Sequence, residues 1–84
     1  MTKKETKAVE SNFKSQLRLS AHYFTEGKHE YSYLVRSGAY NCLMDFMSVL
    51  DADKIEENIL KDYSISVSYF RDVMYDFMNK GGVD

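Results

Sequence analysis

The order of apolar and polar residues between Tyr31 and Leu50 is the most informative pattern in this chain. At about 100° per residue of an α-helix, the apolar side chains of this segment fall on two separate stripes. The first stripe contains Tyr31, Val35, Ala39, Cys42, Leu43, Phe46, Val49 and Leu50. The second stripe contains Tyr33, Tyr40, Met44 and Met47. The polar wedge is formed by Ser37, Asn41, Asp45 and Ser48, with Leu34 among them. Because a surface helix needs only one apolar stripe, the pattern predicts either the central helix of a bundle or a contact surface for another chain.

Residues 3–26 predict a long first helix, because apolar positions recur every three or four residues. Its stripe contains Val9, Phe13, Leu17, Ser20, Ala21 and Phe24. Gly27 follows, and glycine readily adopts the left-handed conformation that ends many helices. Residues 1–5 offer little to bury, so we expect this end to fray.

Two further helices are predicted after Leu50. Asp51 and Asp53 are good N-cap residues, so a short third helix is expected over residues 53–62, burying Ile55, Ile59 and Leu60. Serines then alternate with apolar residues over 64–69 as in a strand. The helical spacing of Val67, Phe70, Met74, Phe77 and Met78 nevertheless favours a fourth helix. Ser64 or Ser66 is its expected cap. Gly81–Gly82 is its expected end, and residues 81–84 are expected to form a C-terminal tail.

These elements predict one all-α domain, a bundle of three to four helices. The 84 residues include no proline and only four glycines, three of them at expected helix ends. Gly38 lies inside the second helix. We expect that helix to continue through it, and a break at Ser37–Gly38 is the alternative. The predicted core contains Phe13, Leu17, Phe24, Val35, Ala39, Leu43, Phe46, Ile59, Phe70, Met74 and Phe77.

Composition and charge indicate the cellular compartment in which we expect the protein. A single cysteine excludes an internal disulfide, which suits a reducing compartment. Apolar runs are too short to cross a bilayer, and the polar start is unlike a signal peptide, so we expect a cytoplasmic protein without a membrane partner. Residues 1–36 carry a charge of +3 and residues 37–84 a charge of −5. We interpret most of this asymmetry as solvated helix faces.

Motifs for catalysis or cofactor binding are absent from the sequence. Asp51, Asp53, Glu57 and Asp62 match ligand positions of a calcium loop, but the position that requires glycine is Glu56. His22 and His29 lack ligand partners at metal spacing and are expected to be solvated. Cys42 is expected to be a buried, inert thiol. We therefore expect no enzyme, no cofactor, no metal and no small-molecule substrate.

Residues 55–78 support a second hypothesis about function. The positions expected to be buried in this segment are Ile59, Tyr63, Ile65, Phe70 and Val73 or Met74. Ser66 is expected to cap the second of the two helices in the segment. This arrangement resembles the helix-turn-helix family, with Ser64 where that family usually has glycine. The resemblance implies a DNA-binding transcriptional regulator with its second helix in the major groove. The nucleic-acid contacts would then include Ser68, Tyr69, Arg71 and Tyr75. Asp72 and Asp76 offset Arg71, which disfavours phosphate binding.

A protein-interaction module is the preferred hypothesis. Tyrosine and methionine are enriched at protein interfaces, and the second stripe holds two of each. We therefore predict a contact face formed by Tyr33, Tyr40, Met44 and Met47. The partner would be another protein or a second copy of the chain, and the module would act as an adaptor, regulator or inhibitor. A third hypothesis is that the acidic side chains of residues 37–84 bind a basic, nucleic-acid-binding site of another protein. These acids are Asp45, Asp51, Asp53, Glu56, Glu57, Asp62, Asp72 and Asp76.

Overall fold

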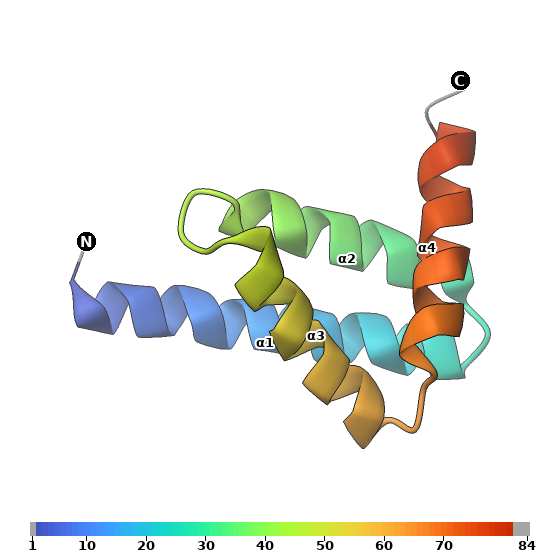
Figure 1. Cartoon of the computed structure of the whole chain (residues 1–84), viewed down its shortest axis with the longest axis horizontal. Helices are drawn as coiled ribbons and strands as arrows, with labels where there is room; N and C mark the ends of the chain where they lie inside the picture. Colours follow the sequence, from blue (N-terminus) through green and yellow to red (C-terminus); the bar gives the residue numbers. More distant parts are fainter. Residues whose placement is uncertain (1, 82–84) are drawn as a thin grey trace.

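Four helices make up the protein in a computed structural model, which describes residues 2–81 (Figure 1). They are α1 (Lys3–Thr25), α2 (His29–Leu43), α3 (Val49–Asp62) and α4 (Val67–Gly81). The described range contains no strand, so the predicted all-α bundle is confirmed. Residues 2–81 also contain no helix that is long and apolar enough to cross a bilayer. Met1, Gly82 and the rest of the predicted tail lie outside the described residues.

The helices form two layers. Helices α1 and α2 make an antiparallel hairpin, and α3 and α4 cross in front of it (Figure 1). The shortest dimension of the molecule is 19 Å, which is the thickness of about two helices of ~10 Å diameter. Gly27 turns the hairpin with a φ of 80°, a conformation that costs glycine little. The arrangement leaves one side of the hairpin covered by α3 and α4 and the opposite side open.

Short polar residues cap three of the helices, as the chemistry of unpaired N-terminal N–H groups requires. Thr2 accepts from the backbone N–H of Glu5 at 3.2 Å, and Ser66 accepts from that of Tyr69 at 3.3 Å. Ser64 and Ser66 were the alternative caps predicted for α4, and the structure confirms Ser66. Residues 3–5 are helical, and the fraying expected for this end stays a prediction.

The predicted extent of the second helix is wrong. Helix α2 ends at Leu43, seven residues early, and continues unbroken through Gly38 as preferred. Ser48 caps α3 by accepting from the N–H of Asp51 at 3.2 Å, so the caps expected at Asp51 and Asp53 are also wrong. A continuous helix would carry the apolar residues of α3 away from the bundle. The turn at residues 44–48 instead brings α3 back against α1.

The core largely follows the prediction. Eight of the eleven predicted core residues are buried, and Ala21, Ala52 and Leu60 complete the buried apolar set. Val35 and Phe77 are only half-buried. Phe46 is 42% exposed, because it lies in the turn that replaces the expected helix. Ser20 and Ser32 are buried between α1 and α2, where the Ser20 hydroxyl donates to the Ser32 carbonyl at 2.9 Å.

Candidate protein-interaction site

Tyr40, a member of the predicted contact face, packs inside the molecule. Its ring meets the edge of Phe13 with centroids 5.3 Å apart, and its hydroxyl donates to Asp53 Oδ1 at 2.9 Å. The guanidinium of Arg36 lies 4.5 Å from the ring centroid. Burial raises the pKa of Tyr40 well above its usual value near 10, and the charge of Glu56 raises it further. Tyr40 therefore joins α1, α2 and α3.

The other three residues of the predicted face lie in different surroundings. Tyr33 stacks on Phe77 of α4 with centroids 5.7 Å apart. Met47 packs, half-buried, against the core. Met44 is 54% exposed. Helices α3 and α4 therefore cover most of the second stripe, whereas Tyr31 and Cys42 of the first stripe are exposed. A role for these four residues in binding stays a prediction, and the structure leaves Met44 the most accessible of them.

A buried carboxylate, Glu56, organises the contact between α2, α3 and α4. It is 1% exposed, and Arg36 donates to both of its oxygens, Nε to Oε2 at 2.5 Å and Nη2 to Oε1 at 3.1 Å. Arg71 Nε lies 3.5 Å from Oε1. Burial tends to lower the pKa of Arg36, but the hydrogen bonds and charge of Glu56 outweigh it and raise that pKa. Sequence spacing does not reveal this cluster, because Glu56 is 20 positions from Arg36 and 15 from Arg71.

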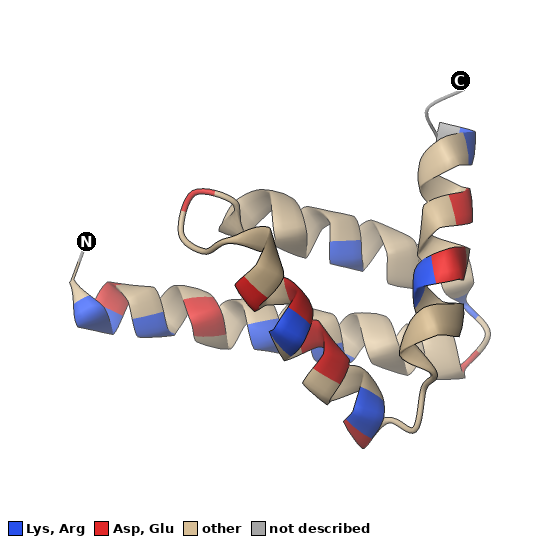
Figure 2. Cartoon of the chain, viewed as in Figure 1, with Lys and Arg blue, Asp and Glu red and all other residues tan. Residues whose placement is uncertain are grey.

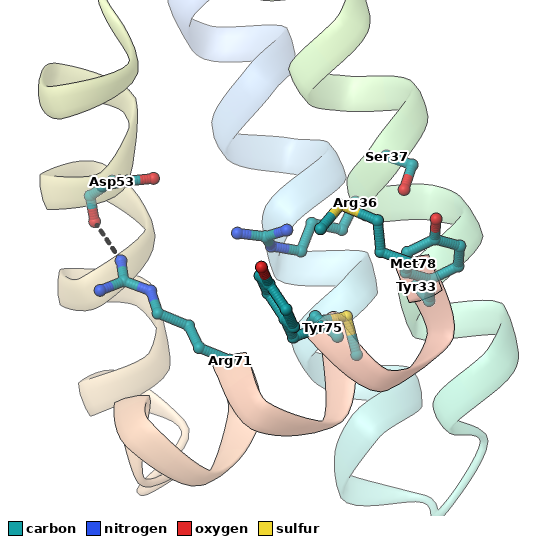
Figure 3. A pocket seen from close by; sticks show the side chains of 8 residues that line it. Tyr33, Arg36, Ser37, Asp53, Arg71, Tyr75 and Met78 are labelled. Atoms are coloured by element: carbon teal, nitrogen blue, oxygen red, sulfur yellow. Dashed lines mark hydrogen bonds between the residues drawn. The ribbon is translucent and has the colours of Figure 1, made fainter. Parts of the chain in front are cut away.

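A cleft of about 250 Å³ opens beside this cluster (Figure 3). Arg36 and Arg71 reach into it from α2 and α4, and Tyr33, Tyr75 and Met78 form much of its wall. Both guanidinium groups are already bound to acids of α3, since Arg71 Nη1 donates to Glu57 Oε1 at 3.1 Å. Three acids, Asp53, Glu56 and Glu57, thus face two arginines, which does not favour an anion. Within the described residues no group of three possible ligands is placed to hold a metal.

The segment that resembles a helix-turn-helix has the turn but not a free arginine. Ser64 has a φ of 57°, the left-handed conformation that the family's glycine would supply. Ser68, Tyr69 and Tyr75 are exposed on α4. Arg71 is tied to α3, donating from Nη2 to the Asp53 carbonyl at 3.3 Å as well as to Glu57. The exposed side of α4 therefore offers little positive charge for phosphates.

Two single residues differ from their expected surroundings. Cys42 is exposed, whereas a buried thiol was predicted. It lines a groove between α1 and α2, together with Gly38 and Ala39. His29 stacks on Phe24 with centroids 4.4 Å apart and is half-buried, so the expectation that it is solvated is wrong. His22 is exposed, as predicted, beside Glu26 at 2.8 Å.

A cluster of exposed apolar side chains lies at the corner between α2 and α3. We call it the corner patch, and it consists of Met44, Phe46, Val49 and Leu50. Their exposures range from 42% for Phe46 to 75% for Leu50, the highest of any large apolar residue described. Asp45 and Asp51 lie among them in the sequence and are also exposed. Figure 2 shows acidic positions, coloured red, in this turn and in α3. The sequence had placed three of these side chains on a core stripe, because the predicted helix ran through the turn.

Comparisons of the chain with protein-family models, curated proteins and solved structures gave no match. Function is therefore inferred from surface chemistry. On that basis the acidic version of the interaction hypothesis loses support, since Asp53, Glu56 and Glu57 are bound to Tyr40, Arg36 and Arg71 within the subunit. Asp45 and Asp51 are exposed beside the apolar side chains of the corner patch.

Proposed function

We propose that this protein is a non-catalytic interaction module that docks its corner patch onto a larger protein as an adaptor, regulator or inhibitor. The observation that carries the proposal is four large apolar side chains exposed within seven residues. Burying one such side chain completely is worth about 1.5–3 kcal/mol. Exposed apolar clusters of this kind typically mark binding surfaces.

The turn presents these side chains in a fixed arrangement. Backbone N–H groups of Phe46 and Met47 both donate to the Leu43 carbonyl, at 2.8 and 3.2 Å. The Ser48 cap fixes the start of α3, and Met47 anchors the turn against the core. A surface that is already ordered loses less conformational entropy on binding. The patch is therefore suited to recognition without refolding.

The shape and charge of the corner indicate the chemistry of the partner. The turn projects from the corner of the bundle (Figure 1), so the complementary surface is a concave apolar groove. Asp45 and Asp51 flank the apolar side chains, which favours basic residues on the rim of that groove. Rim charges mainly affect the association rate. Salt should therefore slow association more than it speeds dissociation.

Photo-crosslinking in the source cell tests this proposal. A photoreactive residue replaces Leu50 in one variant and the exposed Asn79, at the far end of α4, in the matched control. We expect a discrete protein adduct at position 50 that is absent at position 79. No adduct at position 50, or the same adducts at both positions, would count against the corner patch.

The helix-turn-helix reading is the second candidate, favoured by the left-handed Ser64 in the turn between α3 and α4. It would make the protein a DNA-binding regulator whose contacts come from Ser68, Tyr69 and Tyr75. The engagement of Arg71 by Glu57 and Asp53 is the reason that we rank it second.

A further inference from the structure

The side of the α1–α2 hairpin that faces away from α3 and α4 has an open groove of about 320 Å³. We call this side the hairpin face, and its central residues are Gln16 and Leu19 of α1 with Tyr31, Leu34, Gly38 and Cys42 of α2. On α2, Leu34 lies on the opposite side of the helix from Arg36, which binds α3. None of the contacts between α2 and the second layer therefore uses this face.

The hairpin face is apolar and uncharged at its centre. Every residue that lines the groove is neutral. Leu34 in the wall of the groove is 56% exposed, and Tyr31 and Leu19 beside it are 60% and 40% exposed. Exposed apolar side chains around an uncharged groove are typical of a surface that contacts another apolar surface.

Gly38 provides a second observation. A Cβ added at Gly38 would meet nothing within 4 Å, so packing inside the subunit does not require glycine there. Glycine in mid-helix costs about 0.5–1 kcal/mol relative to alanine. The missing side chain exposes backbone in the floor of the groove, where another helix can approach closely.

We propose that a second copy of this chain covers the hairpin face, forming a two-fold dimer in which the two α2 helices cross near Gly38. Each group on the face can pair with its own counterpart, as a two-fold interface requires. The Gln16 amide has both donors and acceptors, the apolar side chains pack on one another, and no charge meets its like. Leu34 stands exposed in the wall of the groove, so the two-fold operation can place it against the groove of the partner copy.

The size of the face sets the expected affinity. Two helices side by side are about 20 Å wide, and the 15 residues of α2 are about 22 Å long. A patch of these dimensions covers about 440 Å², roughly half of the ~800 Å² per partner of a stable standard interface. We therefore expect a reversible dimer with a dissociation constant in the micromolar range. This inference goes beyond the proposed function, because it uses none of the residues of the corner patch.

Sedimentation equilibrium over a range from about 1 to 500 μM tests the dimer. The wild-type average mass should rise from that of one copy toward twice that value. Leu34→Asp should stay monomeric, whereas Leu50→Asp, an equal change at a more exposed apolar residue outside the face, should dimerise like the wild type. Gly38→Ala should melt at a higher temperature at low concentration and dimerise at least fivefold more weakly.

Several results would overturn the dimer. They are a wild-type protein that stays monomeric at 500 μM, or a dimer that persists in Leu34→Asp with an unchanged circular dichroism spectrum. A dimer lost in Leu50→Asp but kept in Leu34→Asp would assign self-association to the corner patch instead. The crosslinking experiment at position 50 tests the proposed function independently of the dimer, because position 50 lies outside the hairpin face.

Discussion

Replacing Glu56 by glutamine removes the charge that holds α2, α3 and α4 together. The substitution keeps the volume of the side chain and leaves Arg36, whose side chain is only 21% exposed, without its bidentate acid. Breaking a buried ion pair by removing one partner typically costs 3–5 kcal/mol. Because Arg36 keeps some contact with water, we expect the lower end, about 3 kcal/mol. For a domain of this size that corresponds to a fall in Tm of roughly 12–24 °C.

The assay is urea denaturation followed by far-ultraviolet circular dichroism, with Glu10→Gln as the matched control. Glu10 pairs with Lys14 at 3.2 Å on the surface of α1, where the two side chains are 37% and 40% exposed. An exposed pair of this spacing is worth about 0.3–0.5 kcal/mol. A Glu56→Gln variant that loses no more stability than Glu10→Gln would contradict a stabilising role for the buried ion pair.

Three further predictions concern Tyr40, Ser64 and Arg71. Tyr40→Phe should cost about 0.5–1.5 kcal/mol at pH 7 by removing the hydrogen bond to Asp53. The raised pKa of Tyr40 means that its contribution is complete below pH 10 and declines above it, as the unfolded chain loses the proton first. Urea midpoints from pH 8 to 11 should therefore fall less steeply in Tyr40→Phe than in the wild type, and equal slopes would contradict the burial of the hydroxyl. Ser64→Gly should raise stability by about 0.5–1 kcal/mol, because it relieves the left-handed φ of 57°, and a lower Tm would show that the serine side chain contributes instead. A gel-shift assay at low salt should show no retardation of mixed-sequence duplex DNA, whereas salt-dependent retardation lost in Arg71→Ala would favour the helix-turn-helix alternative.

Sequence periodicity was sufficient to predict the helical elements and most of the core. The three- and four-residue spacing of Phe13, Leu17 and Phe24 depends only on helix geometry, and the structure confirms that all three are buried. The turn at residues 44–48 was missed because apolar residues continue at helical spacing across it. Ser48 was the available indication, since a serine followed three residues later by an acid is typical of a helix start.

The surfaces were harder to predict than the elements. Which stripe of α2 is covered depends on where α3 and α4 return, and that is set by tertiary contacts such as Tyr40–Asp53 and Arg36–Glu56. These contacts join residues 13 and 20 positions apart, so local spacing does not reveal them. Leu34 was noted as an apolar residue in a polar wedge, and the structure shows it on an open groove.

Docking through the corner patch can be measured as the affinity of the protein for its crosslinked partner. Calorimetric titration should show Leu50→Asp binding at least about 30-fold more weakly than the wild type, which corresponds to ~2 kcal/mol for one lost apolar contact. Leu34→Asp, measured below the concentration at which the wild type dimerises, should bind as the wild type does. A partner that binds Leu50→Asp as tightly as the wild type would contradict docking through the corner patch.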